Sequence, residues 1–436
     1  STLSESGMGF FGTLYPGEES VIAYQAYLVN GFNEGIITEY DDGNGGTDGK
    51  LRIRGGRGSQ KKDNNEDKAI TARAGFSPVL GTNIGLSVHS GKYDDDGNHN
   101  LTIGALDAKV TLGALEIQGE YALAKADIDR EKYATAAEKQ SGFYAQANYH
   151  LFHDLFMNGS VVTLVARGDY MDYDSDRDGE TEQGFTLGAN FRPTEETVFK
   201  FDYTWTWLTP LAGDKGDAQN RFFFSFATYF STGVRVFQRN NFPGLTAALI
   251  LIGAAAAAAG QDDLTESPDG PEAVKVYFTE EEALAEVFAG ADTLWTEAWI
   301  PDSAEKSALE GRLGWELSEN AFAIHRARKG GGDLGYAVVT EEQGRFKPIT
   351  FIVQVSPDGR VGMVLVMVYR ESRGDGVKRQ RFLKQFRKKD VDDHLRLNRD
   401  IVGVSGATMS SRALAAGVKK VLAVIDMRYL SGNGAP

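Results

Sequence analysis

The first 230 residues alternate repeatedly between apolar and polar side chains, and this period of two restricts what the segment can form. In residues 199–207 every odd-numbered position is aromatic, whereas the even-numbered positions hold Lys, Asp, Thr and Thr. Successive side chains of a strand point to opposite faces, so such a strand has one aromatic and one polar face. Residues 115–121, 143–149 and 222–230 alternate in a related way. The pattern predicts an antiparallel all-β domain over residues 1–230.

Two kinds of β domain fit this alternation. A soluble sandwich would turn the apolar faces inward, whereas a membrane barrel would turn them toward lipid and line a lumen with the polar faces. Aromatic residues at strand ends, strands of about 10 residues and long polar loops are typical of membrane barrels. Large aromatic side chains on so many strands would also overfill a soluble core of this size. We therefore expect a transmembrane barrel and keep the soluble all-β domain as the alternative.

Residues 221–230 read Arg-Phe-Phe-Phe-Ser-Phe-Ala-Thr-Tyr-Phe, an aromatic strand that ends in Phe230. This strand resembles the last strand of bacterial outer-membrane porins. The resemblance implies a porin-like barrel in the outer membrane of a Gram-negative bacterium. Only about ten to twelve candidate strands are present, against ~16–18 in large porins, so we expect a partial barrel that lacks N-terminal strands.

Composition excludes several kinds of site. The chain has no Cys, which excludes disulfides, thiolate metal sites, iron–sulfur clusters, c-type haem and Cys nucleophiles. Up to Phe230 there are 20 basic and 34 acidic residues, a balance of −14 out of a total of −15, which argues against nucleic-acid binding. Asp174, Asp176 and Asp178 are spaced like the start of a calcium loop. The twelfth position, however, is Phe185 rather than a bidentate Glu. We interpret the segment as a solvated acidic hairpin loop and predict no metal site.

Residues 231–260 have the order of a secretory signal. Arg235 and Arg239 precede an apolar run at 245–252, and alanines follow at 254–259. The uncharged stretch 242–260 is also about long enough to span a bilayer as a helix, so a retained anchor stays open, as does a buried soluble helix. Because a signal does not belong in mid-chain, we hypothesise two joined reading frames or a signal turned inter-domain anchor.

A linker at 261–271 precedes a segment of different periodicity, 272–430, which a short tail, 431–436, follows. Thr279 and Glu282 have the spacing of a capping box, which predicts a helix start, and a second helix is expected near Ser303. Strands are predicted at 321–328, 335–341, 349–355 and 361–369, with a Pro-Asp-Gly turn at 356–359 and a helix at 379–388. The segment is therefore predicted to be an α+β domain with an antiparallel sheet and flanking helices.

A small-residue loop precedes the last predicted helix. Ser405, Gly406, Ala407 and Thr408 run into a segment with apolar residues at helical spacing. Unpaired amides and the helix dipole favour a phosphate at such a position, and glycine allows a close backbone approach. Thr408, Ser410 and Ser411 offer hydroxyls. On these grounds alone, an ordinary Ser/Thr helix cap remains the alternative.

Residues 405–408 resemble the SGAT flavinylation motif of the FMN-binding domain family, which includes flavin-carrying subunits of the sodium-pumping NADH:quinone reductase and of the Rnf complex. The likeness extends over roughly 272–428. It implies FMN joined through its phosphate to Thr408 by a flavin transferase, with Ser405, Gly406, Ala407, Ser410 and Ser411 around it. The family also has a Glu followed shortly by Gly near the flavin, which here are Glu371 and Gly374. The family's Asp three positions before the Ser is replaced by Val402, and the nearest acid is Asp400.

The resemblance implies electron transfer through FMN by a redox carrier rather than a stand-alone enzyme, with an unidentified redox partner. We expect residues 1–230 in the outer membrane and the FMN domain in the periplasm or anchored to a membrane. The alternatives are a porin for passive diffusion of small, for instance anionic, solutes and an FMN-less domain that binds a partner. Basic residues at 378–381 and 387–389 are interpreted as a solvated face or as a docking surface for an acidic redox partner.

Overall fold

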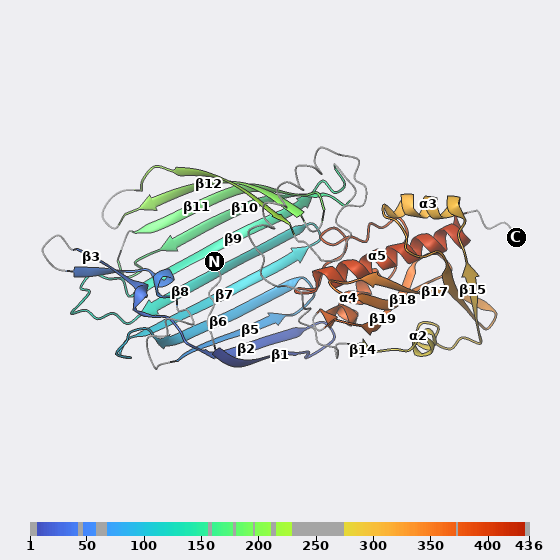
Figure 1. Ribbon diagram of the computed structural model, residues 1–436, viewed down its shortest axis with the longest axis horizontal. Coiled ribbons are helices and arrows are strands. Elements are labelled where there is room, and N and C mark those ends of the chain that lie inside the picture. The colour runs from blue at the N-terminus through green and yellow to red at the C-terminus, as the bar shows by residue number, and fades with distance from the viewer. Residues whose placement is uncertain are drawn as a thin grey trace, which may run out of the picture.

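The computed structural model describes residues 7–41, 47–57, 68–155, 159–177, 180–194, 197–210, 215–228, 274–371 and 374–431. Figure 1 shows a large curved sheet, coloured blue to green, and a smaller body of helices and strands, coloured yellow to red. The smaller body lies at one end of the strands of the large sheet. Phe230, the signal-like segment 231–260, the linker 261–271 and the tail after Ser431 lie outside the described residues.

Within the described residues, eleven strands form one antiparallel sheet in which every strand pairs with its neighbours in chain order. They are β1 (Gly7–Leu14), β2 (Val21–Val29), β5 (Ala69–Ser77), β6 (Thr82–Lys92), β7 (Asn100–Leu112), β8 (Leu115–Ala126), β9 (Lys139–Leu151), β10 (Val161–Asp172), β11 (Thr181–Arg192), β12 (Thr197–Thr209) and β13 (Gln219–Thr228). The prediction of a large antiparallel all-β region is confirmed. In the described part of the chain β1 pairs only with β2 and β13 only with β12, so the sheet does not close on itself.

The apolar face of this sheet is exposed. Phe201 in β12 pairs with Phe224 in β13, and both rings remain about half exposed, at 43% and 56%. Apolar side chains of other strands are exposed as well: Leu86 in β6 is 63% exposed and Phe143 in β9 is 51% exposed. A soluble sandwich would bury these side chains against a second sheet, and no second sheet covers them among the described residues.

The opposite face is polar. On it, Arg73 in β5 forms an ion pair with Asp107 in β7, and Lys109 pairs with Glu116 at 2.7 Å. A cavity of about 600 Å³ lies on this face and is lined by residues that include Arg167, of β10. The hairpin of β3 (Ile37–Asp41) and β4 (Thr47–Leu51) packs near it, together with the short 3-10 helices η1 (Glu34–Ile36) and η2 (Ile53–Gly56).

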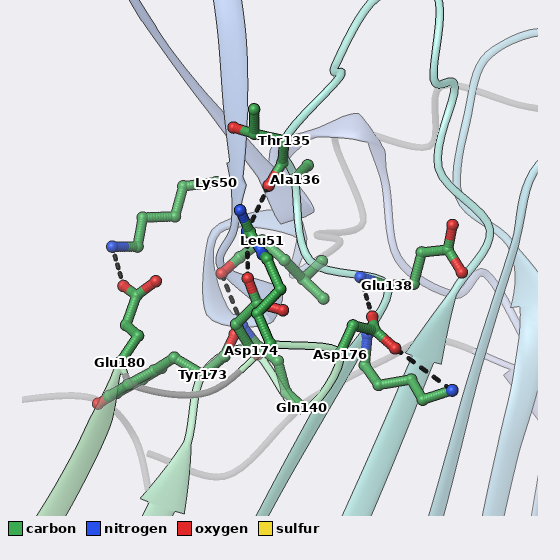
Figure 2. A network of polar contacts seen from close by, with 12 residues as sticks. Lys50, Leu51, Thr135, Ala136, Glu138, Gln140, Tyr173, Asp174, Asp176 and Glu180 are labelled. Carbon is green, nitrogen blue, oxygen red and sulfur yellow. Dashed lines mark hydrogen bonds and ion pairs between the residues drawn. The ribbon is translucent and has the colours of Figure 1, made fainter. Parts of the chain in front are cut away.

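Carboxylates of the acidic loop between β10 and β11 contact other protein groups (Figure 2). Asp174 is 1% exposed and forms an ion pair with Arg177. Asp176 accepts hydrogen bonds from the amides of Glu138 and Lys139 at 3.0 and 3.1 Å. No group of three or more potential ligands is arranged to hold a metal ion in the described ranges, which omit Asp178 and Gly179.

The C-terminal body contains a six-stranded antiparallel sheet and helices that cover it. The strand order is β14 (Lys275–Val276), β19 (Val361–Tyr369), β18 (Pro348–Val355), β17 (Gly332–Gln343), β16 (Phe322–Lys329) and β15 (Thr293–Trp299). The helical elements are α2 (Glu280–Val287), α3 (Ser303–Leu313), η3 (Asp375–Lys378), α4 (Gln380–Leu383), η4 (Lys384–Phe386), α5 (Thr408–Ile425) and the π-helical η5 (Asp426–Leu430). Helix α5 packs on β17 and β18, where Gly417 faces the ring of Phe351.

Most predicted elements of this body are confirmed, with two differences. Thr279 and Glu282 form the predicted capping box, and α3 begins at Ser303. The helix predicted at 379–388 is wrong in length, because α4 and η4 end at Phe386 and Lys388 has a left-handed φ of 65°. Strand β15 was not predicted. In the part of the chain that the structure describes, no helix is both long and apolar enough to cross a bilayer.

Candidate flavin-binding site

The predicted loop 405–408 leads directly into α5, and Thr408 is the first helical residue. The N-cap residue is Ala407, and no side chain caps the helix. Within the described part of the chain, the amides of Thr408, Met409 and Ser410 donate to no acceptor, whereas the amide of Ser411 bonds to the carbonyl of Ala407 at 2.8 Å. The alternative of an ordinary Ser/Thr cap is therefore wrong. Free amides at the positive end of an 18-residue helix suit an anion.

Three of the predicted site residues are open to solvent. Ser405, Gly406 and Thr408 are all classed as exposed, so no other described part of the chain covers these three residues. Gly406 has a φ of 77°, in the left-handed region that favours glycine. A Cβ at this position would meet nothing within 4 Å, so the space around it is free to receive a ligand.

The other loop residues lie beneath this surface. Ala407, Ser410 and Ser411 are 5%, 3% and 0% exposed. The Ser410 hydroxyl is 2.9 Å from the hydroxyl of Tyr369, and the Ser411 hydroxyl accepts a bond from the amide of Val404 at 3.1 Å. The two serine hydroxyls therefore hold the loop and the start of α5 in place from below.

Gly374 and Glu371 follow β19 but occupy different surroundings. Gly374, with a φ of 88°, lies against the loop, since a Cβ there would be 3.4 Å from that of Ala407. Glu371 is 5% exposed, and its carboxylate accepts the amides of Phe346 and Lys347 at 2.7 and 3.2 Å. The structure thus brings Gly374 to the loop, whereas Glu371 orders the turn between β17 and β18.

We expect Gly374→Ala to lower the free energy of unfolding by about 1–3 kcal/mol, because alanine would have to adopt a left-handed φ and its methyl group would clash with Tyr369. The new methyl group would lie 2.6 Å from the Tyr369 hydroxyl, and the Tyr369 ring is fully buried and cannot move aside. Gly406→Ala is the matched control, because it imposes a similar φ without a clash. Thermal unfolding measures the stability of both variants. Equal losses in the two would contradict the steric argument.

The structure shows the surroundings of Val402, which stands where the family has Asp. The side-chain amide of Gln385 bonds both the amide and the carbonyl of Val402, at 2.8 and 3.1 Å. The Asp400 carboxylate accepts the amides of Leu395 and Arg396 at 2.9 and 2.8 Å. The Asp400 carboxylate therefore stabilises the turn between Leu395 and Asp400.

The chain resembles known proteins in this region. Residues 344–423 match the FMN-binding domain family, a range that contains the loop, Gly374 and Glu371. A curated relative is one of the subunits of a proton-translocating ferredoxin:NAD(+) oxidoreductase complex from Clostridium ljungdahlii, 26% identical over 130 residues. The match covers 28% of this chain and 65% of the relative, so the chain spans about two thirds of the relative's length at most. FMN is the cofactor of this region.

The residues present fit a flavin phosphate. The uncapped helix end supplies donors, Gly406 leaves space, and Thr408 presents a hydroxyl. Sequence reasoning missed two supporting residues, Tyr369 and Gln385. The signal for Tyr369 was available, since a tyrosine at the end of a buried strand needs a partner for its hydroxyl.

Proposed function

We propose that the C-terminal domain carries FMN joined through its phosphate to the Thr408 hydroxyl, and that the protein transfers electrons. The observation that carries this proposal is the exposed Thr408 at the uncapped N-terminus of α5. The name of the curated relative, part of an oxidoreductase complex, supports a redox role. The proposed domain covers residues 272–430, and the flavin partners are a flavin transferase for maturation and an unidentified redox protein.

The residues of the loop would act on the phosphate by charge and geometry. The free amides of Thr408, Met409 and Ser410 would donate to its oxygens, and the helix dipole would favour its charge. Arg412 lies one turn further on the same helical face as Thr408, and its positive charge would add to the attraction. FMN supplies the electron-transfer chemistry when it is bound, and the chain supplies the position and surroundings that tune it.

We further propose that residues 1–230 are a porin-like part of an outer-membrane barrel in a Gram-negative cell envelope, with the flavin domain in the periplasm or anchored there. The exposed aromatic face of the sheet supports contact with lipid, since single-sided antiparallel sheets in water bury their apolar face. The strand lengths, 10 to 13 residues over most of β6 to β13, also suit a bilayer crossing.

The test is the intact mass and absorption spectrum of the protein purified from cells that contain a flavin transferase. We expect the mass of the chain plus one esterified FMN, a flavin absorption band, and bleaching of that band by dithionite. A chain of unmodified mass from such cells would contradict covalent attachment. If that chain still binds added FMN in titration, then only the covalent step is wrong.

The alternative function is passive diffusion of small solutes. The polar face of the sheet, with its ion pairs and its cavity of about 600 Å³, favours it. Planar-bilayer conductance of the full chain measures this activity. Conductance without any flavin signal would favour the porin, whereas a flavin signal without conductance would favour the electron carrier.

A further inference from the structure

The C-terminal body touches the large sheet at the turns between its strands. Leu80, in the turn between β5 and β6, packs against the hydrophobic core of the C-terminal body. A Cβ on the next residue, Gly81, would lie 3.1 Å from the side chain of Val402. One turn further along the sheet, a Cβ on Gly113 would lie 3.3 Å from the carbonyl of Arg399. The centre of the contact is therefore close-packed and partly apolar.

Charged groups surround this centre, with opposite signs on the two sides. Lys384 in η4 forms an ion pair with Glu19 in the turn between β1 and β2. Arg396 forms an ion pair with Asp154, in the turn between β9 and β10. The guanidinium of Arg379 lies 3.0 Å from the centre of the Tyr15 ring. The C-terminal body supplies the cations and the sheet supplies the carboxylates and the aromatic ring.

Arg381, in α4, shows how closely the two surfaces fit. It is only 6% exposed, and its guanidinium donates to the hydroxyl of Ser77, at the end of β5, at 2.8 Å. In the described residues its Nε has no hydrogen-bond partner, so the burial shows that the two surfaces lie in close contact at a desolvation cost to the guanidinium. The solvated-face interpretation of the basic residues is therefore wrong for Arg379 and Arg381, which contact the sheet.

We propose that this end of the sheet is a specific binding surface for the basic face of the C-terminal domain. The basic face consists of Arg379, Arg381, Lys384 and Arg396. The two parts recognise each other through these surfaces and do not need the stretch 231–271 that joins them. An apolar centre with a charged rim is the usual anatomy of a specific protein interface. The proposal does not depend on bound flavin.

The docking has a consequence for the loop 405–408. Val402, three residues before Ser405, lies in the contact, and Figure 1 shows the N-terminal end of α5 nearest the sheet. Ser405 and Thr408 nevertheless remain exposed in the docked arrangement. The sheet therefore holds the loop in one place beside its turns without covering the threonine.

The test begins with the folded, detergent-solubilised full chain, with a site for a specific protease inserted between residues 261 and 271. After cleavage, capture through a tag on the N-terminal part is expected to retain the C-terminal fragment at low salt. Release should increase as salt rises to about 1 M, where the screening length falls to roughly 3 Å. Separation of the fragments at low salt would overturn the proposal.

Charge variants identify the surface. Lys384→Glu should weaken retention by about three- to tenfold, because an ion pair is replaced by repulsion. The double variant Glu19→Lys with Lys384→Glu should restore it. Lys306→Glu on α3, which contacts Asn320 in its own domain, is the matched control and should change nothing. An equal effect of Lys384→Glu and Lys306→Glu would refute the assigned surface.

A second measurement needs no cleavage. Because the chain has no Cys, a Glu19→Cys and Lys384→Cys pair gives a single possible cross-link with a short thiol-reactive reagent. We expect efficient linking of this pair at low salt and none for Glu19→Cys with Lys306→Cys. Absence of the first link, or equal yields for both pairs, would contradict docking.

Discussion

Thr408→Ala is expected to abolish covalent flavin and to leave the fold unchanged. Thr408 is exposed, it is the first residue of α5, and the helix has no side-chain cap for the substitution to remove. Surface substitutions of this kind usually change stability by less than about 0.5 kcal/mol. Without the hydroxyl oxygen there is no atom to form the phosphodiester, so the loss should be complete.

The measurement is intact mass together with fluorescence of the denatured chain in a gel, where only covalent flavin remains. Thr408→Ser keeps a hydroxyl and is the matched control, expected to retain most of the flavin. Ser405 is the other exposed hydroxyl in the loop, and peptide mass spectrometry separates the two positions. Covalent flavin that persists on the Thr408→Ala chain would contradict the assignment of Thr408 as the attachment residue.

Ser410→Ala distinguishes attachment from support. Its hydroxyl is buried and bonded to that of Tyr369, so the substitution leaves a buried tyrosine hydroxyl without this partner. The expected result is reduced stability, by about 1–3 kcal/mol, with covalent flavin still present in the folded fraction. This contrast with Thr408→Ala follows from the positions of the two hydroxyls, one outside the loop and one beneath it.

Local signals were sufficient to predict much of the fold. The alternation at 199–207 lies within β12, and the capping box of Thr279 and Glu282 starts α2 as expected. Both depend on neighbouring residues only. The helix predicted at 379–388 ends early because Lys388 pairs its amide with the carbonyl of Val361 in β19, a tertiary contact that helical spacing cannot reveal.

The candidate site was predictable in its first layer and not in its support. The small residues at 405–408 identify a loop before a helix, and the resemblance supplies the ligand. The bond between Tyr369 and Ser410 joins residues 41 positions apart, and that between Gln385 and Val402 joins residues 17 apart. Such pairs depend on how strands and turns are arranged in space, which one sequence does not specify.

The second prediction with a large expected effect concerns a buried ion-pair cluster between α5 and the sheet of the flavin domain. Lys420 in α5 is 2% exposed and pairs with Glu319 and with Glu342, the latter at 2.7 Å. Burial raises the pKa of Glu342, with Lys420 acting against the rise. Burial also opposes ionisation of Glu319, but the hydrogen bond and charge of Lys420 outweigh it and hold its pKa below the usual value.

Lys420→Met is therefore expected to destabilise the C-terminal domain by about 3–5 kcal/mol at neutral pH, because two carboxylates lose their buried cation. Lys419→Met is the matched control, since Lys419 forms no ion pair with Glu319 or Glu342 in the described residues. Hydrogen exchange of the α5 amides reports the local free energy of unfolding in both variants. A loss of the same size for Lys419→Met would show that helix packing, and not the charge cluster, is responsible.

Lys420→Met leaves two carboxylates behind, and the pH dependence of the variant follows mainly from Glu342, whose pKa burial already raises in the unmodified chain. With no cation beside it, Glu342 has a folded-state pKa still further above its value of about 4.3 in an unfolded chain. Between those two values the folded state keeps a proton that the unfolded state releases, so stability falls as pH rises through that window. The loss relative to the unmodified chain should thus be smallest near the lower end of this window and reach its full size above the upper end. Glu342→Gln added to Lys420→Met should flatten the profile, and a loss that does not change with pH would contradict the burial of an unpaired carboxylate.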